Sequence, residues 1–252
     1  MIDHIEKLLS LREIDAIWHE HCKQMAGYGF DRLLYAFTRF HKLHAFGNLD
    51  DMLILSNHDP DYLKVYIGER LFESAPMVKH AATHEGAFSW SLVGEMKRAG
   101  QLSPAELAAT EFNRQHGVQA GYSISFPDTT AHKGGIGLCA RAGLTQADVE
   151  AIWARHRRDI TVLNTIFHLQ VSSLPFARNL LSNRQREALE GVANGKTTAD
   201  IAEAMGVSIP TVEKHLRRAR EALAAETTAQ AVLKATMQQQ LFQTAAGLRA
   251  AS

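Results

Sequence analysis

The chain has 252 residues, 46% hydrophobic and 21% charged, which is typical of a globular protein long enough for two domains. Lysine plus arginine and aspartate plus glutamate number 27 each, so any affinity for nucleic acid must come from a local basic patch. No apolar run is long enough to span a bilayer, the N-terminus lacks a secretory signal and the two cysteines are isolated, so we expect a cytoplasmic protein with reduced thiols.

The first two thirds of the chain alternate between helical and strand-like segments. Apolar residues at helical spacing predict helix within the first ~30 residues. Runs of aromatic and branched residues predict strands, and capping residues such as Ser103 and Thr145 mark helix starts. In chain order we expect strands at 30–40 and 51–56, helices at 60–66, 76–83 and 103–116, strands at 121–126 and 135–141, and a long helix at 146–171.

This order predicts an α+β fold in which residues 1–171 form an α-β-α sandwich around an antiparallel sheet. The two last strands are separated by 127–134, which indicates a hairpin. Residues 172–180 contain Ser172-Ser173-Leu174-Pro175 and are predicted to be a linker. Residues 181–245 are predicted to form an all-α domain of four helices, the last of them at 228–242.

A helix–turn–helix is predicted within this second domain. Gly206 supplies a left-handed helix end, Ser208 an N-cap oxygen, and Pro210 fits the first turn of the following helix. That helix has one apolar and one basic face, which is the arrangement of a helix that enters a DNA major groove. The apolar positions are Val212, Leu216, Ala219 and Leu223, and the candidate DNA contacts are Thr211, Lys214, Arg217, Arg218, Lys196 and Ser208.

Two other interpretations of this segment remain. A helical hairpin could pack only against protein, although turn, caps, apolar stripe and basic face agree on the DNA-binding motif. Region 4 of a sigma factor has the same shape, and Arg217-Arg218-Ala219-Arg220 looks like it. The preceding 170 residues, however, do not look like the all-helical core that a sigma factor needs.

The same segment contains Leu181-Ser182-x-Arg184, Leu189, Ala193-x-Gly195-Lys196-Thr197, Ile201-Ala202, Val207-Ser208, Thr211-Val212 and His215-Leu216. In this pattern it resembles the LuxR-type transcriptional regulators. The resemblance implies a homodimer on a near-palindromic double-stranded operator, with RNA polymerase as a partner and a small-molecule signal as the ligand. One departure is Gln185, where the family has a glutamate after the arginine.

The front of the chain is similar to the autoinducer-binding domain of the same family. The matching pattern runs from Asn57 through His58, Tyr62 and Tyr66 to Ala75-Pro76, Trp90 and Gly121. The resemblance implies an acyl-homoserine lactone pocket, with Tyr62 in place of the tryptophan that holds the lactone carbonyl and His58 in place of a tyrosine. Tyr66 and Trp90 match the other aromatics. The expected apolar walls are Met52, Ile54, Met77, Val78 and Phe88.

The largest departure from that pocket is Ala75, where the family has an aspartate that accepts the amide N–H of the ligand. A buried N–H without a partner costs roughly 1–3 kcal/mol, one to two decades in affinity. Either Glu73 or Cys139 replaces the acceptor, or the natural ligand lacks that amide. We therefore expect an acyl-homoserine lactone or a related small apolar signal.

Several alternatives stay open. Taken singly, Tyr62, Tyr66 and Trp90 are ordinary core aromatics, and the front domain could serve only for dimerisation. The 13 histidines allow a metal- or redox-sensing regulator, with His19-Glu20-His21-Cys22 and His80-x-x-x-His84 as the best candidates, although neither has convincing further ligands nearby.

We expect neither a cofactor nor catalysis. The sequence offers no specific pair of nucleophile and base. Gly134-Gly135-x-Gly137 opens a strand and is better explained as a close-packed turn than as a phosphate loop.

Overall fold

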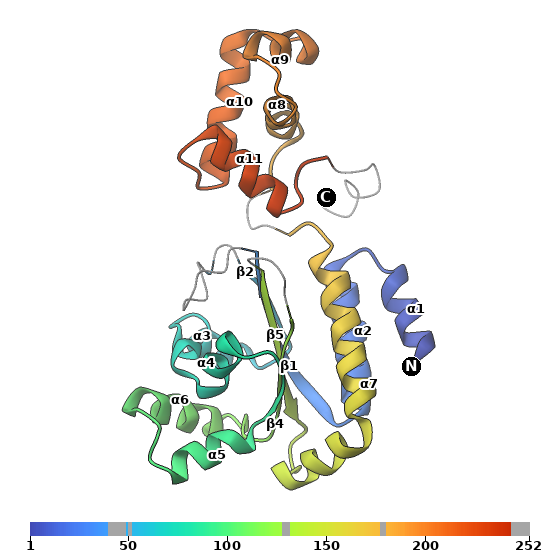
Figure 1. Cartoon of the computed structure of the whole chain (residues 1–252), viewed down its shortest axis with the longest axis vertical. Coiled ribbons are helices and arrows are strands. Elements are labelled where there is room, and N and C mark those ends of the chain that lie inside the picture. The colour runs from blue at the N-terminus through green and yellow to red at the C-terminus, as the bar shows by residue number, and fades with distance from the viewer. Residues whose placement is uncertain (40–48, 50–51, 128–131, 177–179, 243–252) are drawn as a thin grey trace. The chain divides into compact units, whose positions relative to one another are not determined.

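The computed structural model describes residues 1–39, 49, 52–127, 132–176 and 180–242 (Figure 1). The chain divides into two compact units, Met1–Ser172 and Ser173–Ser252, which are described separately.

The first unit is built on an antiparallel sheet with the strand order β2-β1-β5-β4-β3. This confirms the predicted antiparallel sheet, and β4 and β5 pair as the expected hairpin. The edge strand β3 was not predicted, because its four residues are too few to show an alternating pattern. The strands are β1 (Phe30–Thr38), β2 (Met52–Ser56), β3 (Gly86–Ser89), β4 (Gly121–Ser125) and β5 (Lys133–Ala140).

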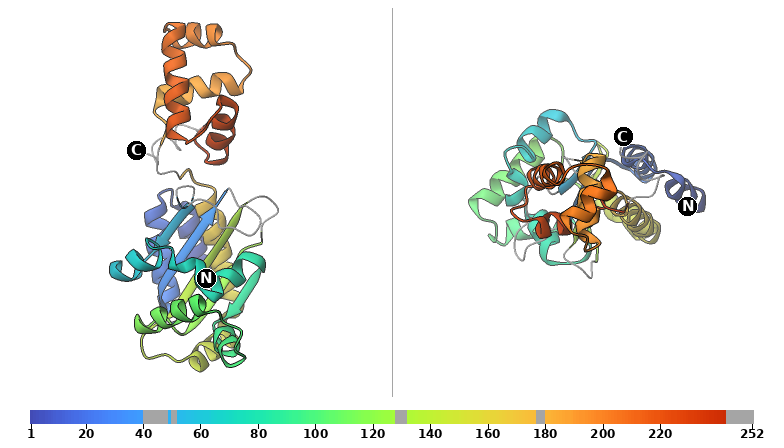
Figure 2. Two further views of the ribbon diagram at one scale, coloured as in Figure 1. Left: turned by 90° about the vertical axis from the view of Figure 1, so that its left-hand side faces the viewer. Right: turned by 90° about the horizontal axis from the view of Figure 1, so that it is seen from above.

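Helices cover both faces of this sheet, which confirms the α-β-α sandwich (Figure 1). In the left panel of Figure 2 the strands lie behind the layer formed by α3 to α6. The N-terminal helical segment is two helices, since residues 11–13 are not helical. One face carries α1 (Ile2–Ser10), α2 (Ile14–Gly27) and α7 (Gln146–Ser172); the other carries α3 (Pro60–Tyr66), the 3₁₀ turn η2 (Leu71–Ser74), α4 (Pro76–Thr83), α5 (Ser91–Arg98) and α6 (Pro104–Gln115).

The layer between the sheet and α7 is a closed core that contains buried histidines. His21 is completely buried, stacks on Phe167 with ring centroids 4.2 Å apart and donates from Nε2 to Asn164 Oδ1 at 3.0 Å. Burial lowers the pKa of His21 to about 3, despite the opposing effect of the hydrogen bond to Asn164. At neutral pH this histidine is therefore an uncharged core residue.

The second unit contains the predicted helices in a compact arrangement: α8 (Asn183–Ala193), α9 (Thr198–Met205), α10 (Ile209–Ala222) and α11 (Thr228–Met237). Gly206 ends α9 with φ of 64°, as expected of a left-handed cap. Gly191 lets α8 approach α9, since a Cβ there would lie 2.6 Å from Ile201 Cγ1.

The last helix is shorter than the sequence predicts. It ends at Met237, and Gln239 then adopts a left-handed backbone with φ of 56°. This reversal brings the side chain of Gln240 back to the start of the unit, where its Oε1 accepts from the backbone N–H of Leu181 at 2.7 Å. The return of the chain toward α8 therefore replaces the final helical turn.

Candidate ligand cavity and DNA-binding face

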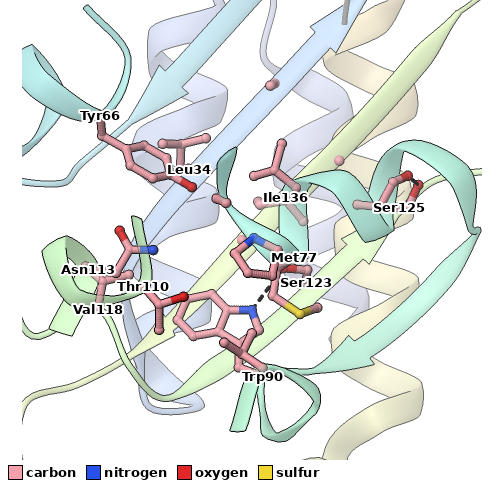
Figure 3. A pocket seen from close by; sticks show the side chains of 18 of the residues that line it. Leu34, Tyr66, Met77, Trp90, Thr110, Asn113, Val118, Ser123, Ser125 and Ile136 are labelled. Carbon is pink, nitrogen blue, oxygen red and sulfur yellow. Dashed lines mark hydrogen bonds between the residues drawn. The ribbon is translucent and has the colours of Figure 1, made fainter. Parts of the chain in front are cut away.

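A cavity of about 530 Å³ lies between the sheet and the helical layer of α3 to α6 (Figure 3). Its lining comes from β1, β2, β4 and β5 on one side and from α3, α4, α5 and α6 on the other. The volume falls within the range of ~300–1,000 Å³ that small-molecule sites occupy. This cavity is the candidate ligand site of the first unit.

The floor of the cavity is hollow because the strands place small residues there. Ser123 pairs with Gly137 and Ser125 with Gly135, and all four line the cavity. A strand directs alternate residues to one face, so small residues at every second position leave space above the sheet. Gly134-Gly135-x-Gly137 lies at the start of β5, as predicted, but the segment is not a turn, because all three glycines belong to the strand. The alternating small residues in β4 and β5 are the signal that would have indicated the floor.

Aromatic rings from α3 form one wall. The ring of Tyr62 stacks on that of Tyr66 at 4.9 Å and on that of His58 at 4.9 Å. Burial raises the pKa of both tyrosine hydroxyls, which stay protonated, and lowers the pKa of His58 to about 4, which leaves its imidazole neutral. The Tyr62 hydroxyl donates to Asn113 Oδ1 at 3.0 Å. A ligand carbonyl would have to compete with Asn113 for that donor.

Trp90 is held in a defined orientation at another wall. Its indole Nε1 donates to Ser123 Oγ at 2.9 Å, as Figure 3 shows. The ring lies over glycines: a Cβ on Gly121 would lie 3.0 Å from the indole, and one on Gly137 3.7 Å. The absence of side chains at these two positions is what lets the indole lie against the sheet.

Ala75 lines the cavity and is 2% exposed, at the N-cap position of α4. Neither candidate for a replacement acceptor reaches the cavity. Glu73 pairs with Arg70 at the surface, and the buried Cys139 thiol lies 3.6 Å from the backbone oxygen of Ala140 and 3.9 Å from that of Gly117. Neither Glu73 nor Cys139 lines the cavity, so the acceptor that the family aspartate supplies has no replacement from these two residues.

The structure brings together eight of the ten expected ligand residues: Met52, His58, Tyr62, Tyr66, Ala75, Met77, Val78 and Trp90. The other two do not line the cavity. Ile54 pairs with Ala36 on the edge strand β2, and the ring of Phe88 packs edge-on against that of His80 at 4.4 Å. The sequence did not predict that α6 lines the cavity, because the helix has an ordinary amphipathic pattern. The lining nevertheless includes Thr110 and Asn113 of α6 and Val118, which follows the helix.

In the second unit, α10 presents the expected basic face. Lys214, Arg217 and Arg218 are exposed, whereas Val212 and Leu216 on the opposite side are buried in the core of the unit. Arg217 has a weak ion pair with Glu221 at 3.7 Å, between two exposed side chains. The basic side chains are thus accessible to a polyanion.

The turn before α10 differs from the expectation in one detail. Ser208 occupies the N-cap position, but its side chain does not cap the backbone and instead lies 2.9 Å from Thr211 Oγ1. Pro210 follows in the first turn, as predicted. Lys196 is exposed in the segment between α8 and α9.

The described histidines and the two thiols bear on the alternative of metal or redox sensing. The part of the chain that the structure describes holds no group of three or more histidine, cysteine or acidic side chains arranged around a metal position. Burial raises the pKa of both Cys22 and Cys139 to about 12, which suppresses the reactive thiolate. Among the described residues there is also no helix with the length and hydropathy that a bilayer crossing demands.

Comparisons with known proteins agree with the division of the chain into two units. The model of the autoinducer binding domain matches residues 13–171, and the model of sigma-70 region 4 matches residues 177–223. The chain is 26% identical over 188 residues to the transcriptional activator protein AnoR of Acinetobacter nosocomialis, which covers 73% of this chain and 76% of AnoR. It is 24% identical over 193 residues to the transcriptional activator protein LuxR of Aliivibrio fischeri, with 74% of each chain covered.

Among solved structures, SdiA in complex with octanoyl-rac-glycerol has a similar fold, with a TM-score of 0.51, 15% identity and 95% of each chain covered. The match to sigma-70 region 4 covers the helix–turn–helix, the shape that a sigma factor shares. The domain in front of it distinguishes this chain from a sigma factor.

Proposed function

Because the chain belongs to the LuxR-type transcriptional regulators with an autoinducer-binding domain, which are not enzymes, we propose that it is a ligand-responsive, sequence-specific DNA-binding protein of the cytoplasm. The observation that carries the proposal is the cavity of about 530 Å³ between the sheet and α3 to α6. Its ligand is an acyl-homoserine lactone or a related small, mostly apolar signal.

The lining of the cavity supports an apolar ligand with a small polar head. Leu34, Met52 and Met77 offer apolar surface, and Tyr66 and Asn113 offer polar groups at one side (Figure 3). With Ala75 in place of an acceptor, a ligand without an amide N–H meets no penalty. Octanoyl-rac-glycerol, which SdiA binds, is an ester of that kind and therefore a reasonable probe.

The mechanism we propose is linkage between ligand and folding. The cavity walls come from segments that are far apart in the sequence, so the site exists only in the folded unit. A ligand that binds only the folded state stabilises it by about 2.7 kcal/mol at a concentration of 100 times Kd. The folded protein then pairs as a homodimer.

The dimer would place two copies of α10 in successive major grooves, about one helical turn apart on a near-palindromic site. Lys214, Arg217 and Arg218 would contact phosphates or guanine edges, with Thr211 near the N-terminus of the helix. Ser208 and Lys196 would position the protein on the backbone, and RNA polymerase would be recruited beside it.

The test is the melting temperature of the purified protein across acyl-homoserine lactones of different chain length and octanoyl-rac-glycerol, combined with mass spectrometry of any co-purified molecule. A rise that depends on chain length supports the proposal. Absence of any rise, with no molecule co-purified, would refute ligand sensing and leave the ligand-independent alternative.

That alternative, a regulator whose front unit only mediates dimerisation, has two observations in its favour. The Tyr62 hydroxyl already has an internal acceptor in Asn113, and Ala75 offers the ligand nothing polar. DNA binding of the ligand-free dimer, measured by fluorescence anisotropy on a selected operator, decides between the two. Full affinity without ligand favours the alternative, and affinity only with ligand favours sensing.

A further inference from the structure

The charge of the cavity lining is one-sided. Among the described residues that line it there is no aspartate and no glutamate, whereas Lys97, Arg98, Arg114 and Lys133 all contribute to it. His58 is neutral, because burial holds its pKa at about 4. An electrically neutral chain has thus placed cations alone around this cavity.

Three of these cations form what we call the basic rim: Lys97 and Arg98 at the end of α5, and Arg114 near the end of α6. All three side chains are exposed and still line the cavity. Arg114 forms a bidentate ion pair with Glu111, from Nη2 to Oε1 at 2.6 Å and from Nε to Oε2 at 2.8 Å, so part of the arginine charge is compensated. Lys97 also lowers the pKa of Glu111, after the larger effect of Arg114, which places the two helix ends near each other.

Lys97 and Arg98 are the unengaged members of the rim. Neither forms a hydrogen bond or an ion pair with any residue that the structure describes. Cations in the last turn of a helix interact favourably with its carbonyl groups, which is the ordinary structural role for such residues. Arg98, however, folds back along α5, with Nη1 3.5 Å from where a Cβ on Gly94 would stand, and Gly94 also lines the cavity.

The polar groups inside the cavity also favour a ligand that accepts hydrogen bonds. Asn113 Oδ1 accepts from the Tyr62 hydroxyl and the Asn113 amide group also interacts with the Tyr66 hydroxyl, which leaves one amide N–H of Asn113 for a ligand. Figure 3 shows this amide nitrogen and the Tyr66 hydroxyl among the residues around the cavity. Ser123 Oγ accepts from the Trp90 indole, so its own hydrogen is available to a ligand. The side chains of Asn113 and Ser123 can therefore each donate a hydrogen bond to a ligand.

We propose that the ligand of this cavity is an amphiphilic anion, a carboxylate with an apolar chain or ring, whose charged group lies at the basic rim within reach of Lys97 and Arg98. This inference rests on the proposed function, since it specifies the class of signal for the same cavity. The chain or ring occupies the space above the small residues of β4 and β5. The carboxylate accepts from the rim cations and loses little hydration, because the rim is exposed.

The experiment compares decanoate with methyl decanoate, which differ mainly in head-group charge, and N-octanoyl-homoserine lactone with its ring-opened carboxylate. Kd is measured by isothermal titration and melting temperature in parallel, at 50 and 500 mM salt. The variant is Lys97→Met with Arg98→Met, since methionine keeps the apolar stem. The control is Lys64→Met with Arg158→Met, two exposed cations away from the lining.

We expect each carboxylate to bind about three- to tenfold more tightly than its neutral counterpart, as two partly screened charge contacts imply. High salt and the rim variant should both remove this advantage, while the neutral ligands and the control variant are unaffected. Equal or better binding of the neutral ligands would overturn the anion inference and leave the proposed function intact. Absence of binding by all four probes would overturn both.

Discussion

Replacement of Ala75 by aspartate tests whether the missing acceptor governs which ligands the cavity takes. The residue is 2% exposed, lines the cavity and stands at the N-cap of α4 without any side-chain cap. An aspartate there has two possible partners, the amide N–H of a bound acyl-homoserine lactone and the free backbone N–H groups of the first turn of α4. Pairing with the ligand would raise ligand affinity, whereas capping of α4 would raise the stability of the ligand-free protein.

The magnitudes follow from these partners. Pairing a buried ligand N–H that now lacks an acceptor is worth about 1–3 kcal/mol, a gain in affinity of about 5- to 150-fold for N-decanoyl-homoserine lactone. Capping of α4 would instead raise the stability of the ligand-free protein by about 0.5–2 kcal/mol. For a unit of this size, 1 kcal/mol corresponds to about 2–4 °C in melting temperature.

The assay is titration of wild type and variant with N-decanoyl-homoserine lactone and with octanoyl-rac-glycerol, which has no amide N–H. Ala75→Asn is the matched variant, because it supplies an acceptor without a charge. We expect the lactone to gain and the glycerol ester to stay unchanged or weaken. Weaker lactone binding in both variants, or a raised melting temperature without any gain in affinity, would refute the reasoning that the cavity lacks an acceptor for this amide.

Three further perturbations have defined outcomes. Gly137→Leu should abolish ligand-induced stabilisation, because a side chain at this position starts 3.7 Å from the Trp90 indole and extends into the cavity. The stabilisation that is lost is about 2.7 kcal/mol, or about 5–11 °C in melting temperature, at 100 times Kd, and calorimetry with and without ligand measures it. Arg217→Ala should weaken binding to a selected operator about 5- to 150-fold by fluorescence anisotropy without lowering the melting temperature, since its ion pair is exposed. His21 has a folded-state pKa of about 3, below its usual 6.5, so the unfolded chain binds the proton first as the pH falls. The free energy of unfolding should therefore decrease below about pH 6.5, by about 1.4 kcal/mol per pH unit. His21→Gln keeps a donor to Asn164 and should reduce that slope by about one proton, as measured by denaturant titrations at several pH values.

Each of these has a contrary result that would count against it. Ligand stabilisation that survives in Gly137→Leu would place the ligand elsewhere. Unchanged DNA affinity in Arg217→Ala would mean that another face of α10 meets the DNA. An unaltered pH slope in His21→Gln would mean that this histidine is not neutral in the folded core.

Local pattern alone predicted most elements of the first unit. The bounds of α3 and α4 agree with the prediction residue for residue, because Pro60 and Pro76 fix the first turn of each helix. The structure adds β3 and α5, which are short and contain Gly86 and Gly94. Weak local signals of this kind become ordered only through strand pairing and packing.

The C-terminal helix–turn–helix was determined almost entirely by the sequence, since its caps, turn glycine and apolar stripe are local features within a few residues of one another. The cavity was not, because its floor, walls and rim come from strands and helices distant in sequence. Small residues on alternate positions of β4 and β5 leave space only once the two strands pair in register. The bond from Tyr62 to Asn113 and the gathering of Lys97, Arg98 and Arg114 likewise depend on how the helices pack over the sheet. Sequence therefore determined what kind of protein this is, and the tertiary packing decided which chemistry its cavity offers to a ligand.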